Sequence, residues 1–309
     1  MRQPVKIFQT RPIVGRRTSP YSGPVASPAA IPSFDIIGPA EPATPVIVSV
    51  PHAGRDYPPA LTAALRVPVD AIRALEDRHV DAVARAARGT ETMLIQRRPR
   101  AWIDLNRAER DRDPRVEAGG ASALAMLSAK AKSGLGLIPR RVSPVGDIWK
   151  WPIEADDVRD RIARDHRPYH AMLTRLLATA RARFGVAVLI DLHSMPPLAP
   201  PHHLTRLVIG DRFGTSAGAR IVAQVEGAAA GHGMRAALNA PYAGGHILDR
   251  HGDPARGIHA IQIELDRRLY LDPALDRPDP EGVAASARLV RRLIDAIGDA
   301  ITVLPAAAE

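Results

Sequence analysis

Short apolar runs rich in β-branched residues alternate with long amphipathic stretches along this chain. The runs have the length of strands, whereas the amphipathic stretches carry apolar residues at the spacing of a helix face. Strands that alternate with helices are typical of a parallel sheet covered by helices on both faces. The sequence therefore predicts an α/β domain with three layers, α/β/α, around a mainly parallel central sheet.

The expected elements are distributed over most of the chain. We expect strands at 45–50, 92–96, 101–105, 186–192, 204–209, 235–239 and 258–265, and helices at 61–65, 71–87, 156–183, 215–231 and 282–300. Pro168 can interrupt the longest helix, because proline has no N–H to donate. Residues 107–151 follow neither pattern, and loops of this length usually have a function or are mobile. Residues 1–44, rich in Pro, Ser, Arg and Ala, predict a flexible tail before a single domain over 45–303.

Composition limits the chemistry that is available. The chain has no cysteine, so any metal must be held by His, Asp or Glu, which favours zinc, manganese or magnesium. The formal charge is +9 and the pI about 10.5. Because the arginines are scattered and no nucleic-acid-binding motif is present, we expect no nucleic-acid partner. The positive charge instead suits a cleft that attracts small anionic substrates.

The sequence contains no run that approaches the roughly 20 apolar residues of a membrane span. The N-terminal stretch also lacks the continuous apolar segment of a secretory signal. We therefore expect a soluble cytoplasmic protein without a membrane partner, and the sequence makes no prediction of the oligomeric state.

Two histidines lie where expected strands end. His52 follows the first apolar run through Pro51, and His193 follows the run 186–192. In an open α/β sheet, ligands bind in the crevice at the carboxyl ends of the strands. Ala53 and Gly54 after His52 leave room for a ligand. The two imidazoles therefore predict one metal or acid–base site; the alternative for His52 is a structural hydrogen bond.

Carboxylates lie near these histidines in the sequence. Asp191 precedes His193 by two residues, so both side chains point to the same face of a strand, where the carboxylate can orient the imidazole. The alternative is a buried Asp held by backbone amides. The cluster of Glu76, Asp77 and His79 can supply a carboxylate for a three-ligand zinc site with water in the fourth position. Its alternative is the solvated face of a helix.

Glu264 interrupts an apolar run that otherwise predicts a central buried strand. A carboxylate in such a place is either paired structurally or positioned as a general base.

Asp104, Asn106 and Arg107 stand at the end of another expected strand and form a candidate anion clamp. The Arg107 guanidinium can hold a substrate carboxylate through two parallel hydrogen bonds. The alternative is a surface ion pair of Arg107 with Glu109 or Asp111.

Taken in order, these segments resemble those of the N-formylglutamate amidohydrolase family. The matching stretches are SVPHAG at 49–54, EDRH at 76–79, IDLNR at 103–107, DLHS at 191–194, GGH at 244–246, RHG at 250–252 and QIEL at 262–265. No single stretch is decisive, but the ordered set is specific. The resemblance implies an α/β/α fold with a mixed sheet, related to that of zinc carboxypeptidases and aminoacylases.

The resemblance implies one zinc ion per chain, held by His52, Asp77 and His193. The carboxypeptidase pattern has a glutamate ligand three residues after the first histidine, but Arg55 stands at this position here. The carboxylate ligand must therefore come from elsewhere. Asp77 is our choice and Glu76 is the alternative.

The resemblance further implies roles in catalysis and substrate binding. Glu264 is expected as the general base and Arg107 beside the substrate carboxylate, with Arg250 and His251 assisting the oxyanion or the substrate. The other expected substrate-binding residues are Asn106, Gly245 and His246.

The function that the resemblance implies is a metal-dependent amidohydrolase of amino-acid catabolism, in histidine degradation. It would release formate, or another small acid, from a small anionic N-acyl amino acid such as N-formylglutamate. A hydrolase of another N-acyl or peptide-like amide is the alternative within this class. A non-catalytic anion-binding protein of the same fold is the alternative from another class.

Overall fold

The computed structural model describes residues 32–118 and 128–302 and contains a mixed sheet of seven strands in the order β1-β3-β2-β8-β11-β9-β10. The strands are β1 (Phe34–Ile37), β2 (Val46–Val50), β3 (Thr92–Gln96), β8 (Ala187–Met195), β9 (Leu207–Gly210), β10 (Ala236–Leu238) and β11 (Ile258–Asp266). The four central strands β3, β2, β8 and β11 run parallel, whereas β1 and β9 run antiparallel to their neighbours β3 and β11. The predicted α/β class is confirmed, with a mixed sheet.

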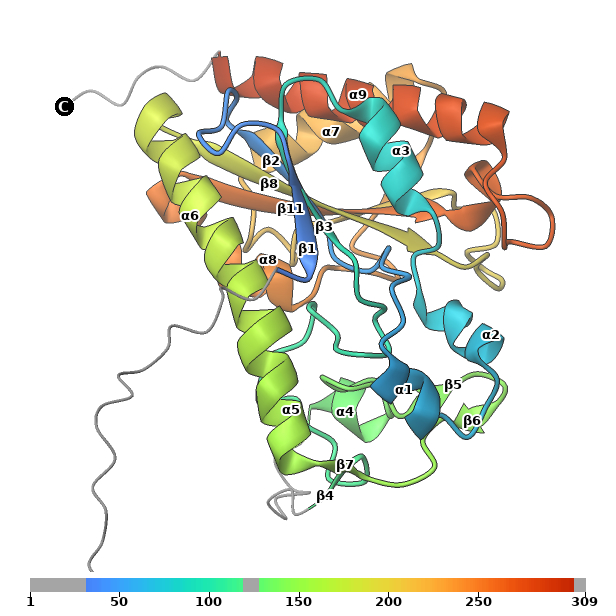
Figure 1. Cartoon of the computed structure of the whole chain (residues 1–309). Helices are drawn as coiled ribbons and strands as arrows, with labels where there is room; N and C mark the ends of the chain where they lie inside the picture. Colours follow the sequence, from blue (N-terminus) through green and yellow to red (C-terminus); the bar gives the residue numbers. More distant parts are fainter. Residues whose placement is uncertain (1–31, 119–127, 303–309) are drawn as a thin grey trace, which may run out of the picture. The chain divides into compact units, whose positions relative to one another are not determined.

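Helices cover both faces of this sheet (Figure 1). One apolar core lies under α3 (Val80–Ala87), α7 (Ala219–Gly231) and α9 (Pro280–Thr302). A second lies under α6 (Arg167–Phe184) and α8 (His246–His251), on the opposite face. The predicted three layers are therefore confirmed. Among the described residues, no helix has both the length and the apolar character that crossing a bilayer requires.

Smaller elements connect these layers. They are α1 (Pro59–Ala64), α2 (Val69–Ile72), η1 (Arg73–Leu75), β4 (Glu117–Ala118), α4 (Ala129–Lys132), β5 (Arg141–Val142), β6 (Gly146–Asp147), β7 (Ile153–Glu154), α5 (Ala155–Arg161), η3 (Ile162–His166), η4 (Pro254–Arg256) and η5 (Arg267–Leu269). Several of them belong to the long segment 107–151, which the sequence left without regular structure.

The central strands change character towards their carboxyl ends. Successive side chains of a strand point to opposite faces, so residues two apart share a face. On β8, Leu189 packs into the core beneath α6, while Asp191 and His193 follow on the same face. On the neighbouring β11, Glu264 lies directly across from His193 in the register. One face of the sheet therefore changes from apolar to polar where these strands end.

The sheet begins upstream of the expected domain start at residue 45. Strand β1 pairs with the edge of the sheet, with Phe34 opposite Gln96 and Ile37 opposite Met93. Strand β1 lies at the edge of the sheet and has only four residues, so it offers too short an apolar run to indicate a strand. The expected tail over residues 1–44 therefore includes β1, which belongs to the sheet. Residues 1–31 lie outside the described residues.

The prediction of a strand at 101–105 is wrong. The N–H of Trp102 donates to the carbonyl of Pro99, and the N–H of Asp104 donates to the carbonyl of Leu137, so this segment turns and joins no sheet. Ile103 and Leu105 are nevertheless completely buried. The alternation of apolar residues indicates that this segment is buried. A turn inside the core shows the same alternation as a strand.

The long helix predicted at 156–183 is present but changes its winding. Helices α5 and α6 are joined through η3, a π-helical segment at Ile162–His166, directly before Pro168. A proline removes one hydrogen bond of the α-helical pattern, and a π turn accommodates such an irregularity without ending the helix. The helix therefore continues through the proline.

Candidate functional site

His52, Asp77 and His193 each direct one donor atom into a common space, within 4.8 Å of one another. The Nδ1 atom of His193 lies 2.9 Å from Oδ2 of Asp77, and Nδ1 of His52 lies 3.6 Å from the same oxygen. All three side chains are buried, and Nδ1 of His52 has no hydrogen-bond partner among the described residues. Two imidazoles and a carboxylate around an unpartnered buried nitrogen form a donor set that suits a zinc ion.

The local fold explains how Asp77 reaches this space. The helix predicted at 71–87 is interrupted: Val80–Ala87 forms α3 as expected, but the chain turns between η1 and α3, where His79 takes a left-handed conformation with φ of 57°. In this turn, the backbone N–H of Asp77 donates to the carbonyl of His52 at 3.0 Å. The turn is thereby joined to the end of β2, and the Asp77 carboxylate lies beside the imidazole.

A second carboxylate holds each imidazole from behind. The Nε2 atom of His52 lies 2.8 Å from Oδ1 of Asp104, and Nε2 of His193 lies 2.8 Å from Oδ2 of Asp191. Asp191 also accepts a hydrogen bond from the Ser49 hydroxyl, so its partners are side chains and not the backbone amides of the alternative. Such outer carboxylates orient metal-binding imidazoles and raise their basicity. Both rings are thus turned with Nδ1 towards the common space.

The electrostatics of this site favour a bound cation. Burial by itself raises the pKa of the Asp104 carboxyl, but Arg100, Arg107 and His52 hold this pKa well below its usual value. Burial by itself lowers the pKa of the His193 imidazole. The carboxylates of Asp191 and Asp77 outweigh burial and raise this pKa well above its usual value. A site that retains charged carboxylates and draws a proton onto an imidazole attracts positive charge.

Glu264 lies beside this donor set. Its carboxylate is buried, its Oε1 accepts a hydrogen bond from Gln262 at 3.0 Å, and no ion pair to it is found among the described residues. Burial, together with the nearby Asp77, raises the pKa of the Glu264 carboxyl to about 7, although His193 opposes the shift. A pKa near neutrality suits a group that takes and returns a proton.

These groups line one cavity of about 600 Å³. Its wall also carries five basic side chains, Arg100, Arg107, Lys130, Arg141 and Arg267. Arg107 donates to the carbonyls of Leu135 and Asn106, and its Nε lies 3.8 Å from Oδ2 of Asp104. Among the described residues it forms neither ion pair of the alternative, and Glu109 pairs with Arg167 instead. The cavity therefore combines a candidate cation site with a wall that attracts anions.

Two of the expected substrate-binding residues, Asn106 and Gly245, meet at the cavity wall. Oδ1 of Asn106 accepts a hydrogen bond from the N–H of Ile247 at 2.9 Å. A Cβ atom at Gly245 would lie only 2.4 Å from this Oδ1, so the close approach requires glycine.

Glu76 and His79 belong to the same turn as Asp77 but do not line the cavity. The Glu76 carboxylate accepts hydrogen bonds from the Tyr57 hydroxyl and, at 2.9 Å, from Arg78. Glu76 and Asp77 are both buried, so the solvated helix face considered as the alternative is wrong. Of the two candidate carboxylates, the structure brings Asp77 to the histidines.

His246, Arg250 and His251 are not among the residues that line this cavity, so their expected roles in catalysis and substrate binding stay predictions. They belong to α8, where Arg250 is exposed and His251 is buried with its Nε2 2.9 Å from Nδ1 of His170. Since α8 begins directly after Gly245, its turns carry the following side chains away from the cavity.

No sequence pattern distinguishes Arg100, Lys130, Arg141 or Arg267 as site residues. Arginine is so frequent in this chain that no single one stands out. These side chains meet at the cavity because of the path that the loops take, and the sequence pattern does not predict that path.

Comparison with known proteins bears directly on this arrangement. Residues 44–271 match the family described as N-formylglutamate amidohydrolase. This chain belongs to that family. The N-formylglutamate deformylase of Pseudomonas putida is 30% identical over 261 residues, which cover 82% of this chain and 92% of the relative. That of Pseudomonas aeruginosa is 28% identical over 264 residues, with the same coverage.

Solved structures of similar fold include an N-formylglutamate amidohydrolase from Ralstonia eutropha. It has a TM-score of 0.78 and 33% identity, covering 86% of this chain and 98% of that one. A gene product of Agrobacterium tumefaciens has a TM-score of 0.65 and 20% identity, covering 88% and 95%, and shares the fold. The family match over residues 44–271 includes every strand of the seven-stranded sheet except β1, and all the residues that line the cavity.

Proposed function

We propose that this chain is a metal-dependent amidohydrolase that splits N-formylglutamate into formate and glutamate. The observation that carries this proposal is the convergence of His52, Asp77 and His193 next to Glu264 in a cavity lined with basic side chains. The names of the relatives from Pseudomonas putida and Ralstonia eutropha support the substrate.

The metal ligands in this proposal are Nδ1 of His52, Oδ2 of Asp77 and Nδ1 of His193. Zinc is the expected ion, because two imidazoles and one carboxylate are a usual ligand set for catalytic zinc. When bound, the ion polarises the amide carbonyl and lowers the pKa of water towards neutrality. The unpartnered Nδ1 of His52 supports this role.

Glu264 acts as the proton carrier. It takes a proton from the attacking water and delivers it to the amide nitrogen as the C–N bond breaks, so that glutamate leaves as a neutral amine. A carboxyl with a pKa of about 7 is able to perform both transfers near neutral pH. Its position opposite His193 places it next to the proposed metal ligands.

The basic wall binds the substrate. N-formylglutamate carries two carboxylates, and a dianion needs more than one cationic partner. Two guanidinium nitrogens of Arg107 donate to backbone carbonyls, while its Nη2 has no hydrogen bond among the described residues and is available to a substrate carboxylate. Lys130 is a further cationic partner in the same cavity, whereas Arg100, Arg141 and Arg267 add positive charge there but already pair with Asp104, Asp147 and Asp77.

A panel of N-formyl-, N-acetyl- and N-succinyl-glutamate, assayed for released amine, tests this function. We expect N-formylglutamate to be the best substrate, and we expect activity to disappear on chelation and return with Zn²⁺. Turnover of the N-acetyl or N-succinyl compound alone would assign another acyl group. A chain that hydrolyses none of them after metal loading would contradict the proposal.

A further inference from the structure

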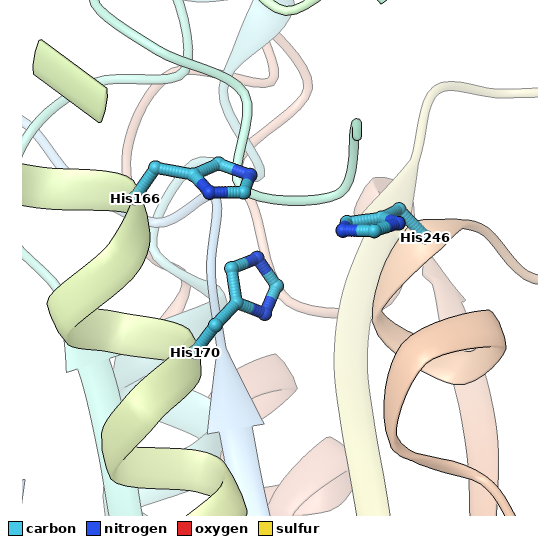
Figure 2. Close-up of side chains that lie close together, drawn as sticks. All are labelled: His166, His170 and His246. Atoms are coloured by element: carbon cyan, nitrogen blue, oxygen red, sulfur yellow. The ribbon is translucent and has the colours of Figure 1, made fainter. Parts of the chain in front are cut away.

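A second cluster of histidines lies outside the cavity. Figure 2 shows the rings of His166 and His170 projecting from one helix, with the ring of His246 facing them from a neighbouring helix. One ring nitrogen of each lies within 4.8 Å of the others. We propose that these three imidazoles form a second metal site, for a divalent transition-metal ion such as zinc. This inference goes beyond the proposed function and does not depend on it.

Two nitrogens of this cluster are buried without a partner. Nε2 of His166 lies 2.8 Å from the carbonyl oxygen of Arg107, which can only accept, so this nitrogen carries the proton and Nδ1 carries the lone pair. Nδ1 of His166 and Nε2 of His246 have no hydrogen-bond partner among the described residues. Folded proteins rarely leave buried polar atoms unpartnered, and such atoms call for an unseen water or ion.

His170 becomes a ligand through a change of tautomer. Its Nε2 lies 3.0 Å from the carbonyl oxygen of Leu105, and its Nδ1 lies 2.9 Å from Nε2 of His251. The bond between the two rings forms with either ring as donor. When Nδ1 of His170 donates to His251, Nε2 of His170 keeps its lone pair for the metal and gives up its hydrogen bond to Leu105. His251 then holds the ligand from behind, as outer partners do at metal sites.

The backbone presents two of the ligands together. His166 ends the π-helical segment η3, and His170 lies four residues further in α6. Residues four apart lie on the same face of a helix, and this spacing recurs in zinc-binding helices. Single π turns inside α-helices are frequently found at functional sites.

Charge also suits this site. Burial disfavours the charged form of all three rings and so lowers their pKa. Oε1 of Glu109 lies 3.9 Å from Nδ1 of His166 and is a nearby carboxylate that can add a negative ligand. The guanidinium of Arg250 is a nearby positive charge, which opposes the binding of a cation at this site.

A metal here would strengthen one wall of the cavity. His166 contacts the carbonyl of Arg107, the residue after Asn106. His246 directly follows Gly245, whose backbone approaches Asn106. The second ion would therefore join α6, α8 and the segment that carries Arg107.

Metal content of the full chain tests the proposal. The protein is loaded with Zn²⁺, loosely bound metal is removed, and zinc per chain is measured. We expect His246→Gln to lose about one ion per chain relative to the parent, as one three-histidine site predicts. The matched control is His202→Gln, an exposed histidine, which should retain the parent value. Equal zinc in the parent and in His246→Gln would overturn the second site.

The same measurement on His193→Gln reports on the first site, so failure of the proposed function is distinguished from failure of this inference. Histidine modification by diethyl pyrocarbonate tests the unmodified chain and needs no variant to fold. We expect Zn²⁺ to protect the half-buried His246 while His202 reacts equally with and without metal. Labelling of His246 that zinc does not change would overturn the proposal.

Discussion

Nε2 of His52 lies 2.8 Å from Oδ1 of Asp104, a carboxylate with no exposed surface. The same carboxylate accepts hydrogen bonds from Nε of Arg100 and from the backbone N–H of Asn106. Asp104 thus joins a proposed metal ligand to the wall of the cavity. It turns Nδ1 of His52 towards Asp77 and ties this orientation to the segment that leads to Arg107.

Removal of the Asp104 charge should weaken metal binding by His52. Asp104→Asn keeps the size of the side chain and removes its charge, so the affinity for zinc should fall about 10- to 100-fold. Competition with a chromogenic chelator measures this change. Asp56→Asn, an exposed carboxylate paired with Arg98, is the control and should retain the affinity. An unchanged affinity in Asp104→Asn would show that Asp104 has no part in metal binding.

Glu264→Gln tests the proton carrier. The amide cannot accept a proton, so kcat on N-formylglutamate should fall by about 10²-fold or more while zinc content stays unchanged. Glu281→Gln, an exposed glutamate in α9, is the control and should keep full activity. Activity of Glu264→Gln equal to that of the parent would remove Glu264 from the mechanism.

Arg107→Gln tests the substrate clamp. Loss of a hydrogen-bonded ion pair should reduce kcat/KM for N-formylglutamate about 10- to 100-fold, since such bonds contribute about 1.5–3 kcal/mol. N-formylglutamine, which lacks the side-chain carboxylate, shows which carboxylate Arg107 binds: the reduction is smaller for it only if the side-chain carboxylate is the partner. The exposed Arg110→Gln serves as control. Unchanged kinetics on both substrates would place the carboxylate elsewhere.

Gly245→Ala tests the close approach at the cavity wall. The added Cβ would meet Asn106 at 2.4 Å, so we expect a loss of about 1–3 kcal/mol in unfolding free energy and lower activity. Gly227→Ala in α7 places its Cβ in open space and should stabilise the helix by up to about 1 kcal/mol. Urea unfolding of both variants checks this. A Gly245→Ala protein as stable and active as the parent would show that Asn106 moves freely.

Glu91→Gln tests a pH-dependent ion pair. The two Glu91 oxygens each lie 2.9 Å from a nitrogen of Arg291 in α9. Burial alone raises the pKa of the Glu91 carboxyl, but Arg291 and backbone N–H groups lower it below its usual value. A depressed pKa in the folded state gives stability that is present above the unfolded pKa and is lost as the pH falls through the folded pKa.

We therefore expect Glu91→Gln to cost about 1–2 kcal/mol at pH 7, because a partly buried charged hydrogen bond is lost. The difference from the parent should vanish once the pH falls below the depressed pKa of Glu91. Urea unfolding of the parent and the variant, at pH 7 and at a pH below the pKa of Glu91, measures this difference. A deficit that stays constant with pH would assign the effect to packing instead of charge.

Much of the fold follows from local pattern. The central strands β2, β8 and β11 were expected within a few residues of their observed bounds, because continuous β-branched runs predict buried strands directly. The edge strand β1 and the turn at 101–105 were not predicted correctly. The edge strand β1 has only four residues and so offers too short an apolar run, and a buried turn shows the same alternation of apolar residues as a strand.

The sequence by itself determined which chemical groups stand at the strand ends. His52 follows β2, and the two-residue spacing of Asp191 and His193 in β8 places them on one face, since these relationships depend only on the period of a strand. The tertiary structure alone decided that Asp77 and not Glu76 joins the histidines, and that His166, His170 and His246 meet. Those relationships arise from turns and from helices distant in sequence, whose geometry is set by packing and not by local periodicity.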